Sequence, residues 1–196
     1  MTSRHMPAAS ATPAATLAEL IDRLGRLVRA ESHAGGLNPA QWEALRYLTR
    51  CNRFSNTPGA VAQYLNATKG TVSQTLNALE RKNLLVRKPD PASKRVVRLA
   101  LTAEGQALAR HDPAAELKRA AAALPAPQQD ATAGGLAAIL GHLQQSRGGR
   151  PFGVCRTCRH FRGTAPDGAP HWCALLHEPL DEPDSLAICV EHQPAA

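Results

Sequence analysis

The chain has 196 residues and a net charge of +7, from 23 Lys and Arg against 16 Asp and Glu. Its length suits one domain of ordinary size with an appendage. No stretch of the sequence is apolar for long enough to cross a membrane, and the first residues lack the apolar run of a secretory signal. We therefore expect no membrane partner and a cytoplasmic location, where thiols stay reduced.

The basic charge is confined to the first part of the chain. Residues 1–150 contain 20 Lys and Arg against 10 Asp and Glu, whereas residues 151–196 contain 3 against 6 and four of the five cysteines. A basic body favours a polyanionic partner, although a basic surface that only keeps the chain soluble gives the same count. We expect three parts: a disordered arm over 1–15, a body over 16–147 and a Cys-rich extension over 148–196.

The body begins with two predicted helices. The stretch LAELIDRLGRLVRAES places apolar residues at intervals of three and four, which predicts an amphipathic helix over about 16–32. Asn38 caps a second helix with Pro39 at its first position. This helix runs through AQWEALRYLTRC, and we expect it to bury Trp42 and Leu45.

Two shorter helices and a pair of strands come next. Thr57 caps a third helix over PGAVAQYLN, and a fourth covers about 68–82. Beta-branched residues around Pro-Asp-Pro then predict antiparallel strands at about 84–88 and 95–101. Thr102 caps a further helix, and helical patterns resume at AAELKRAAAAL and DATAGGLAAILGHLQQS.

This element order predicts a mainly α fold with a small β wing, the winged helix–turn–helix. The second helix of that motif buries one face, here Val72, Leu76 and Leu79, and presents the other to a major groove of double-stranded DNA. Polar side chains on the outward face reach base edges and phosphates, although a merely solvated polar face is the alternative. The predicted DNA-binding residues on this helix and the hairpin are Thr68, Lys69, Thr71, Ser73, Gln74, Asn77, Arg81, Lys94 and Arg95.

The stretch AVAQYLNATKGTVSQTLNALERKNLLVRKPDPASKRVVRLALTAEG resembles the DNA-binding core of MarR-family transcriptional regulators, and the resemblance extends in element order from about Leu17 to Gln145. It implies a homodimer, formed by interlocking first and last helices, that binds a pseudo-palindromic operator, most often as a repressor. It also implies Arg95 as the wing-tip arginine. The family commonly has an acidic residue where Ser93 stands, so Asp90 is the candidate brace for that arginine.

The resemblance also implies a small-molecule effector, because many relatives bind small aromatic acids between their dimerisation and DNA-binding regions. Four residues could line such a pocket here: His33, Trp42, Arg46 and Arg50. Ordinary surface or core positions are the alternative for each of them. The chain shows no Gly-rich nucleotide loop and no paired carboxylates at a recognisable spacing, so we expect it not to be an enzyme.

The extension contains four cysteines in the spacing C-x2-C-x14-C-x15-C, at Cys155, Cys158, Cys173 and Cys189. A segment of this size with few large apolar side chains buries too little surface to fold alone, and metal binding supplies the missing free energy. Four thiolates suit Zn²⁺ or an iron–sulfur cluster. Only one close pair is present, and a four-iron cluster accepts ligands from separated loops more readily than one zinc ion. We therefore favour a 4Fe-4S cluster.

Alternatives to this cluster stay open. One is a structural zinc site, held either by all four cysteines or by three of them with His171 or His192 replacing one thiol. Others are a redox dithiol without metal and an adaptor whose acidic extension docks a protein partner. If the cluster senses redox or iron state, we expect its loss to unfold the extension, to change the packing against the dimerisation helices and so to alter operator binding.

Overall fold

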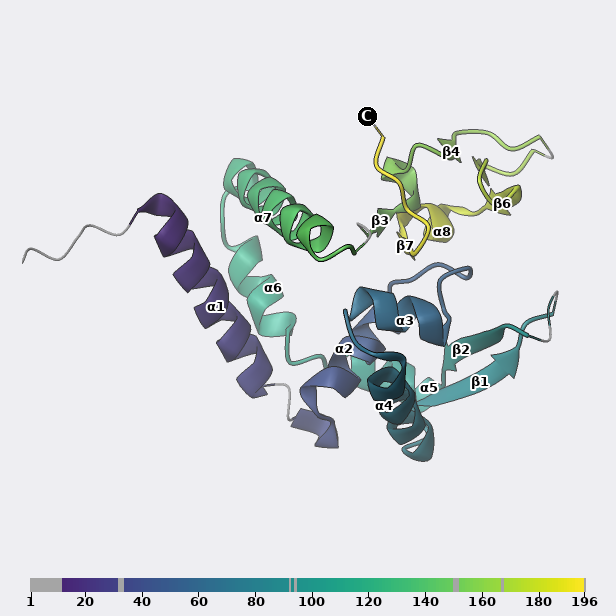
Figure 1. The fold of residues 1–196 in the computed structure, drawn as a ribbon, viewed down its shortest axis with the longest axis horizontal. Helices are drawn as coiled ribbons and strands as arrows, with labels where there is room; N and C mark the ends of the chain where they lie inside the picture. Colours follow the sequence, from purple (N-terminus) through teal and green to yellow (C-terminus); the bar gives the residue numbers. More distant parts are fainter. Residues whose placement is uncertain are drawn as a thin grey trace, which may run out of the picture.

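The computed structural model in Figure 1 describes residues 12–31, 34–91, 93, 95–149, 152–166 and 168–195. The elements of the body are α1 (Pro13–Glu31), the 3-10 turn η1 (Ala34–Gly36), α2 (Pro39–Leu48), α3 (Pro58–Tyr64), α4 (Lys69–Arg81), β1 (Leu85–Pro89), β2 (Val97–Leu101), α5 (Ala103–Ala109), α6 (Ala115–Ala122) and α7 (Ala126–Ser146). They follow the predicted order of a helical fold with one small hairpin.

The extension folds into short elements of its own. They are β3 (Gly153–Val154), the 3-10 turn η2 (Cys155–Thr157), β4 (Phe161–Arg162), β5 (His171–Cys173), β6 (Glu178–Leu180), α8 (Glu182–Leu186) and β7 (Ile188–Cys189). Strands β4, β5 and β6 form one antiparallel sheet, and β3 pairs with β7.

The hydrophobic core of the body lies between α2, α3, α4 and the β1–β2 hairpin. Trp42, Leu45 and Tyr47 from α2 are buried against apolar side chains of α3 and α4. The hairpin is antiparallel, with Leu85 opposite Leu101, and Leu85 and Leu99 point into the same core. The hairpin is therefore rooted in the helix–turn–helix core, and its turn projects away from it (Figure 1).

Side-chain caps start the helices of the body where the sequence predicted them. Asn38 accepts a hydrogen bond from the backbone N–H of Gln41, and the Gln41 side chain accepts one from the N–H of Asn38, which completes a capping box. Thr57 and Thr102 cap α3 and α5 with their hydroxyl oxygens, which accept from the N–H three residues later. In α5, Gly105 lies so close to the carbonyl of Leu84 that a Cβ would stand 2.0 Å from that oxygen.

Two predicted boundaries differ from the structure. Helix α1 begins at Pro13, so residues 13–15 of the expected arm are helical, while residues 1–11 lie outside the described part of the chain. Helix α2 ends at Leu48, three residues before the predicted end at Cys51. The N–H groups of Thr49 and Cys51 still bond to the Leu45 and Tyr47 carbonyls, and the chain then turns to pair with the extension.

Helices α1, α6 and α7 carry apolar side chains that the described chain leaves exposed. Helix α1 lies beside α6 (Figure 1), where Leu24, Leu27 and Val28 face Leu117. None of the described residues of α6 or α7 is buried. The exposed leucines of these three helices are Leu17, Leu20, Leu24, Leu27, Leu117, Leu136, Leu140 and Leu143, and Leu124 between α6 and α7 is exposed as well. No helix in the described residues is long and apolar enough to span a membrane.

The extension is joined to the body through the segment that connects α2 to α3, residues 49–57, which we call the connecting segment. Ile188 of β7 forms a parallel bridge with Cys51: its N–H donates to the Arg50 carbonyl at 2.8 Å, and its carbonyl accepts from the Asn52 N–H at 2.9 Å. The Ile188 side chain belongs to the core of the body. The boundary between body and extension expected at residue 148 is thus crossed by shared core packing.

Truncating Ile188 tests whether body and extension unfold together. Ile188→Ala is expected to lower the free energy of unfolding by about 2–5 kcal/mol, because it leaves a cavity in the shared core. Chemical denaturation followed by circular dichroism measures the change. Leu186→Ala, two residues away at a side chain that is 56% exposed, is the control and should change the stability far less. Equal effects of the two variants would contradict the shared core.

Candidate nucleic-acid interface and cysteine-rich extension

Helix α4 has one buried and one open face, as the sequence predicted. Val72, Leu76 and Leu79 are buried in the core. The predicted DNA-binding residues of this helix and its N-cap are all exposed, namely Thr68, Lys69, Thr71, Ser73, Gln74, Asn77 and Arg81. The structure therefore places a continuous polar surface on the outer side of α4.

The N-terminus of α4 is held by a hydroxyl cap. The Oγ1 atom of Thr68 accepts from the N–H of Thr71 at 3.1 Å and lies 2.9 Å from the Thr71 hydroxyl. Thr75, between Ser73 and Asn77, does not belong to the open face. Thr75 is buried, and its hydroxyl donates to the Thr71 carbonyl, because a small hydroxyl can turn back onto its own helix.

Arg87 of the hairpin links helix α4 to the wing. Arg87 of β1 donates to the Oδ1 atom of Asn77 at 2.7 Å and forms an ion pair with Glu80. The Asn77 amide is thereby oriented with its NH2 group as the free donor. No local pattern reveals this contact, because it joins residues of two different elements.

The turn of the wing is braced by Asp90, but through a different arginine from the one expected. Asp90 accepts from the Nε atom of Arg98 at 2.5 Å and from the N–H of Ser93 at 3.1 Å. Arg95 is exposed at the tip, and Lys94 lies outside the described residues. Asp90 therefore takes the bracing role, and the arginine that it holds is Arg98 of β2.

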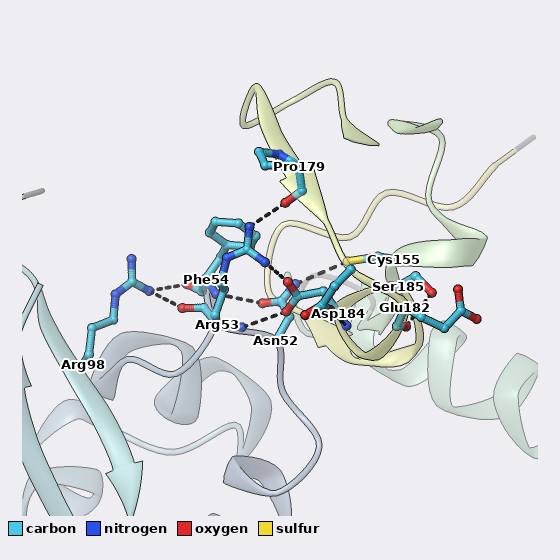
Figure 2. Close-up of polar contacts among 10 residues, drawn as sticks. Asn52, Arg53, Phe54, Arg98, Cys155, Pro179, Glu182, Asp184 and Ser185 are labelled. Carbon is cyan, nitrogen blue, oxygen red and sulfur yellow. Dashed lines mark hydrogen bonds and ion pairs between the residues drawn. The ribbon is translucent and has the colours of Figure 1, made fainter. Parts of the chain in front are cut away.

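Arg98 also reaches back to the connecting segment. Its Nη1 atom donates to the carbonyls of Arg53 and Phe54 at 3.0 and 2.9 Å, and to the Asn56 side chain at 3.3 Å. The backbone N–H of Leu99 donates to the Asn56 carbonyl at 2.7 Å. Wing and connecting segment are thus joined by several hydrogen bonds, some of which Figure 2 shows.

Three of the four cysteines of the extension pack into one cluster. Cys155 and Cys189 are buried and lie on the paired segments that contain β3 and β7, and Cys173 of β5 packs against them. Cys158 follows Cys155 in a tight turn, in which its N–H donates to the Cys155 carbonyl at 2.9 Å. All the described cysteines are free thiols.

The sulfur atoms receive N–H donors. Asn52 of the connecting segment donates its side-chain amide to the Cys155 sulfur at 3.3 Å, and the Gln193 backbone donates to the Cys158 sulfur at 3.5 Å. The hydrogen bond from Cys155 lowers the pKa of Cys189 to about 6, against the opposing effect of burial, and Glu191, Asn52 and Ser55 lower it further. The same contact and burial raise the pKa of Cys155.

Three histidines of the extension have a buried ring nitrogen. The Nε2 atom of His160 and the Nδ1 atoms of His171 and His192 are buried and have no hydrogen-bond partner in the described structure. The ring of His192 packs on Gly153, where a Cβ would come within 2.5 Å of it. Even so, across residues 12–195 as described, no three His, Cys, Asp or Glu side chains are positioned together as a set that could hold a metal ion.

Two of the four residues expected at an effector pocket do line a cavity. Arg46 and Arg50 border a volume of about 560 Å³ together with Tyr64, Leu140 and Phe152. Arg46 is held by a bidentate contact with Asp112. Burial raises the pKa of Asp112, but the hydrogen bonds from Arg46 and from the Ala114 N–H, together with the charge of Arg46, lower it overall. Trp42 is instead in the core, and His33 lies outside the described residues.

These features define a winged helix–turn–helix. The model of the MarR family matches residues 35–96, which span the helix–turn–helix and the first strand of the wing. The chain matches none of the curated proteins with which it was compared.

Solved structures share the fold. The MepR–DNA complex of S. aureus is 21% identical, with a TM-score of 0.57, over 70% of this chain and 100% of that one. A MarR transcriptional regulator from Methanosarcina mazei Go1 is 19% identical, with a TM-score of 0.55, over 66% and 97%. A mutant of MarR from E. coli is 22% identical, with a TM-score of 0.51, over 67% and 99%. These structures match about the length of the body in this chain.

Removing the hydroxyl cap of α4 tests how the polar face is positioned. Thr68→Ala is expected to cost about 0.5–2 kcal/mol of stability, because the N–H of Thr71 loses its acceptor. Thermal unfolding measures the loss. Ser73→Ala, at an exposed position of the same helix, serves as the control and should change the midpoint little. A cap that contributes nothing would leave both variants with the midpoint of the parent chain.

Proposed function

We propose that this protein is a homodimeric transcriptional regulator that binds a pseudo-palindromic DNA site and acts there as a repressor. The observation that supports this best is the exposed polar face of α4 beside a basic wing, on a fold shared with the MepR–DNA complex. The MarR family consists of transcription regulators and not enzymes. The cytoplasm is the compartment that suits such a regulator.

The chemistry of the open face suits duplex DNA. Gln74 and Asn77 offer amide donors for base edges, while Lys69 and Arg95 offer cations for phosphates. Asn77 presents its NH2 group, because Arg87 occupies its oxygen, so it suits an acceptor such as O6 or N7 of guanine.

The exposed leucines of α1, α6 and α7 support the homodimer. An apolar stripe along three helices is costly to leave in water, and a second copy of the chain would cover it. A two-fold dimer presents two α4 helices, which accounts for a pseudo-palindromic site. The cavity beside Arg46 and Arg50 is the candidate for a small-molecule effector.

Loss of DNA binding in a surface variant tests the main proposal. The protein would first select its own duplex from a random pool. Replacing Gln74, Asn77 and Arg95 with Ala is then expected to weaken binding by about 100-fold or more, because base and backbone contacts are lost together. Fluorescence anisotropy measures the affinity. Replacing exposed Glu104 with Ala is the control. Unchanged affinity in the triple variant would overturn the proposal.

We further propose that Cys155, Cys158, Cys173 and Cys189 bind a metal centre, with an iron–sulfur cluster favoured over a zinc site of four cysteines or of three cysteines and one histidine. Support comes from the spacing of the cysteines, from the packing of three of them together, and from N–H donors to two sulfurs, which stabilise thiolates. His171 and His192 each keep a buried ring nitrogen for the zinc site that includes a histidine. The bound metal would supply folding free energy to the extension.

Anaerobic purification distinguishes the metals. We expect a brown protein with an absorption shoulder at about 400 nm and about four irons per chain, because the thiolate ligands of an iron–sulfur cluster transfer charge to iron at visible wavelengths. Elemental analysis and the visible spectrum are the measurements, and Cys173→Ser is the variant that should lose the metal. A colourless protein with one zinc per chain would favour the zinc site instead. A protein without any metal would overturn both, leaving the redox dithiol and the adaptor.

A further inference from the structure

The extension, the connecting segment and the wing form one chain of contacts (Figure 2). The first link joins the extension to the connecting segment. Arg53 forms an ion pair with Asp184 of α8 and donates to the carbonyl of Pro179, while its backbone N–H donates to Asp184 at 3.4 Å. A second contact runs from the Val190 N–H to the Ser55 hydroxyl at 2.9 Å.

The second link joins the connecting segment to the wing. Arg98 is its central residue, because one guanidinium binds the Arg53 and Phe54 carbonyls with Nη1 and the Asp90 carboxylate with Nε. A planar guanidinium donates in fixed directions, so it holds its acceptors in a defined arrangement. The carbonyls that Arg98 needs are presented only while the connecting segment keeps its conformation.

The connecting segment is held in its conformation partly by the body, through the Tyr47 hydroxyl that donates to the Ser55 carbonyl at 2.8 Å, and partly by the extension. It is not helical, and its ends are the C-terminus of α2 and the N-cap of α3. Asn52 and Ser55 are buried in it and are satisfied by contacts that include the extension: Asn52 donates to the Cys155 sulfur, and Ser55 accepts from Val190. Detaching the extension would leave buried polar groups unpaired, which forces the segment to rearrange.

From this geometry we infer that Arg98 is a positioning residue that couples the folded state of the extension to the position of the DNA-binding wing. A folded extension holds the connecting segment, the segment holds Arg98, and Arg98 holds the Asp90 turn below the exposed Arg95. Release of the extension would free the wing while α4 stays in the core. The functional part of this inference rests on the proposed DNA binding. In this inference the extension is coupled to DNA binding through the connecting segment and Arg98, whereas the sequence had led us to expect coupling through the dimerisation helices.

The first test needs no DNA. Asp184→Asn removes the charge that holds Arg53, and Glu182→Gln is its matched control on the same helix, since Glu182 contacts Arg156 and His171 of the extension itself. Hydrogen exchange of the Leu99 amide, which donates to Asn56, is expected to speed up by about 5- to 10-fold in Asp184→Asn. Glu182→Gln should not change it. Exchange that is equal in the two variants would overturn the inference.

Arg53→Ala distinguishes the loss of this ion pair from a general folding defect of Asp184→Asn, because it removes the same ion pair by changing the residue of the body. Arg53→Ala and Asp184→Asn should each speed the exchange of the Leu99 amide, and the double variant should add little to either. The Val72 and Leu76 amides of α4 are the internal reference and should stay protected. Faster exchange throughout α4 would indicate general unfolding and would overturn the specific coupling to the wing.

The second test reads DNA binding. Arg95→Ala is expected to lower the slope of log affinity against log salt by about one per subunit. In the Asp184→Asn background the same replacement should lower it by less than half as much, because the wing is already released. Equal effects in both backgrounds would overturn the inference. If the Leu99 amide responds but no variant binds DNA, the proposed function fails and the structural coupling stands.

Discussion

The backbone bridge between Ile188 and the connecting segment is the contact on which the arrangement of this protein depends. Its two hydrogen bonds place the Ile188 side chain in the core of the body. They also align the neighbouring Cys189 with the sulfur of Cys155 and the amide of Asn52. Because short strands alone are weakly stable, the extension gains a rigid base from the helix–turn–helix, and the helix–turn–helix gains a support for an irregular segment.

Sequence periodicity was sufficient for the helical part of the fold. The caps at Asn38, Thr57, Thr68 and Thr102 are local signals, since each side chain bonds the backbone three residues later, and each was located in advance. The buried stripe of α4 follows from the same periodicity. The open face and the hairpin could therefore be predicted, and with them most of the candidate DNA-binding surface.

Contacts between distant parts of the chain were not accessible in this way. Arg98 and Arg87 are ordinary strand residues by local pattern, and their partners Arg53 and Asn77 lie on other elements. Asp90 was recognised as a substitute brace, but its partner is Arg98. The Asp90 N–H donates to the Val96 carbonyl, and Arg98, two residues further along, faces the same side because side chains alternate along a strand. Apart from its apolar side chain, nothing in the sequence indicates that Ile188 packs into the core of the body.

The charge pattern of the chain acquires a physical meaning from this arrangement. Figure 1 shows the acidic extension and α4 on opposite sides of α3. Cations lie along α4 and the wing, among them Lys69, Arg81 and Arg95, while Asp184 of the extension pairs with a cation of the body. A polyanion would be attracted to the α4 side and repelled from the extension, so the charge distribution and the open helix face favour the same direction of approach. In the proposed regulator the extension would act on DNA binding through the body, and the route that the contacts provide leads through the connecting segment to Arg98.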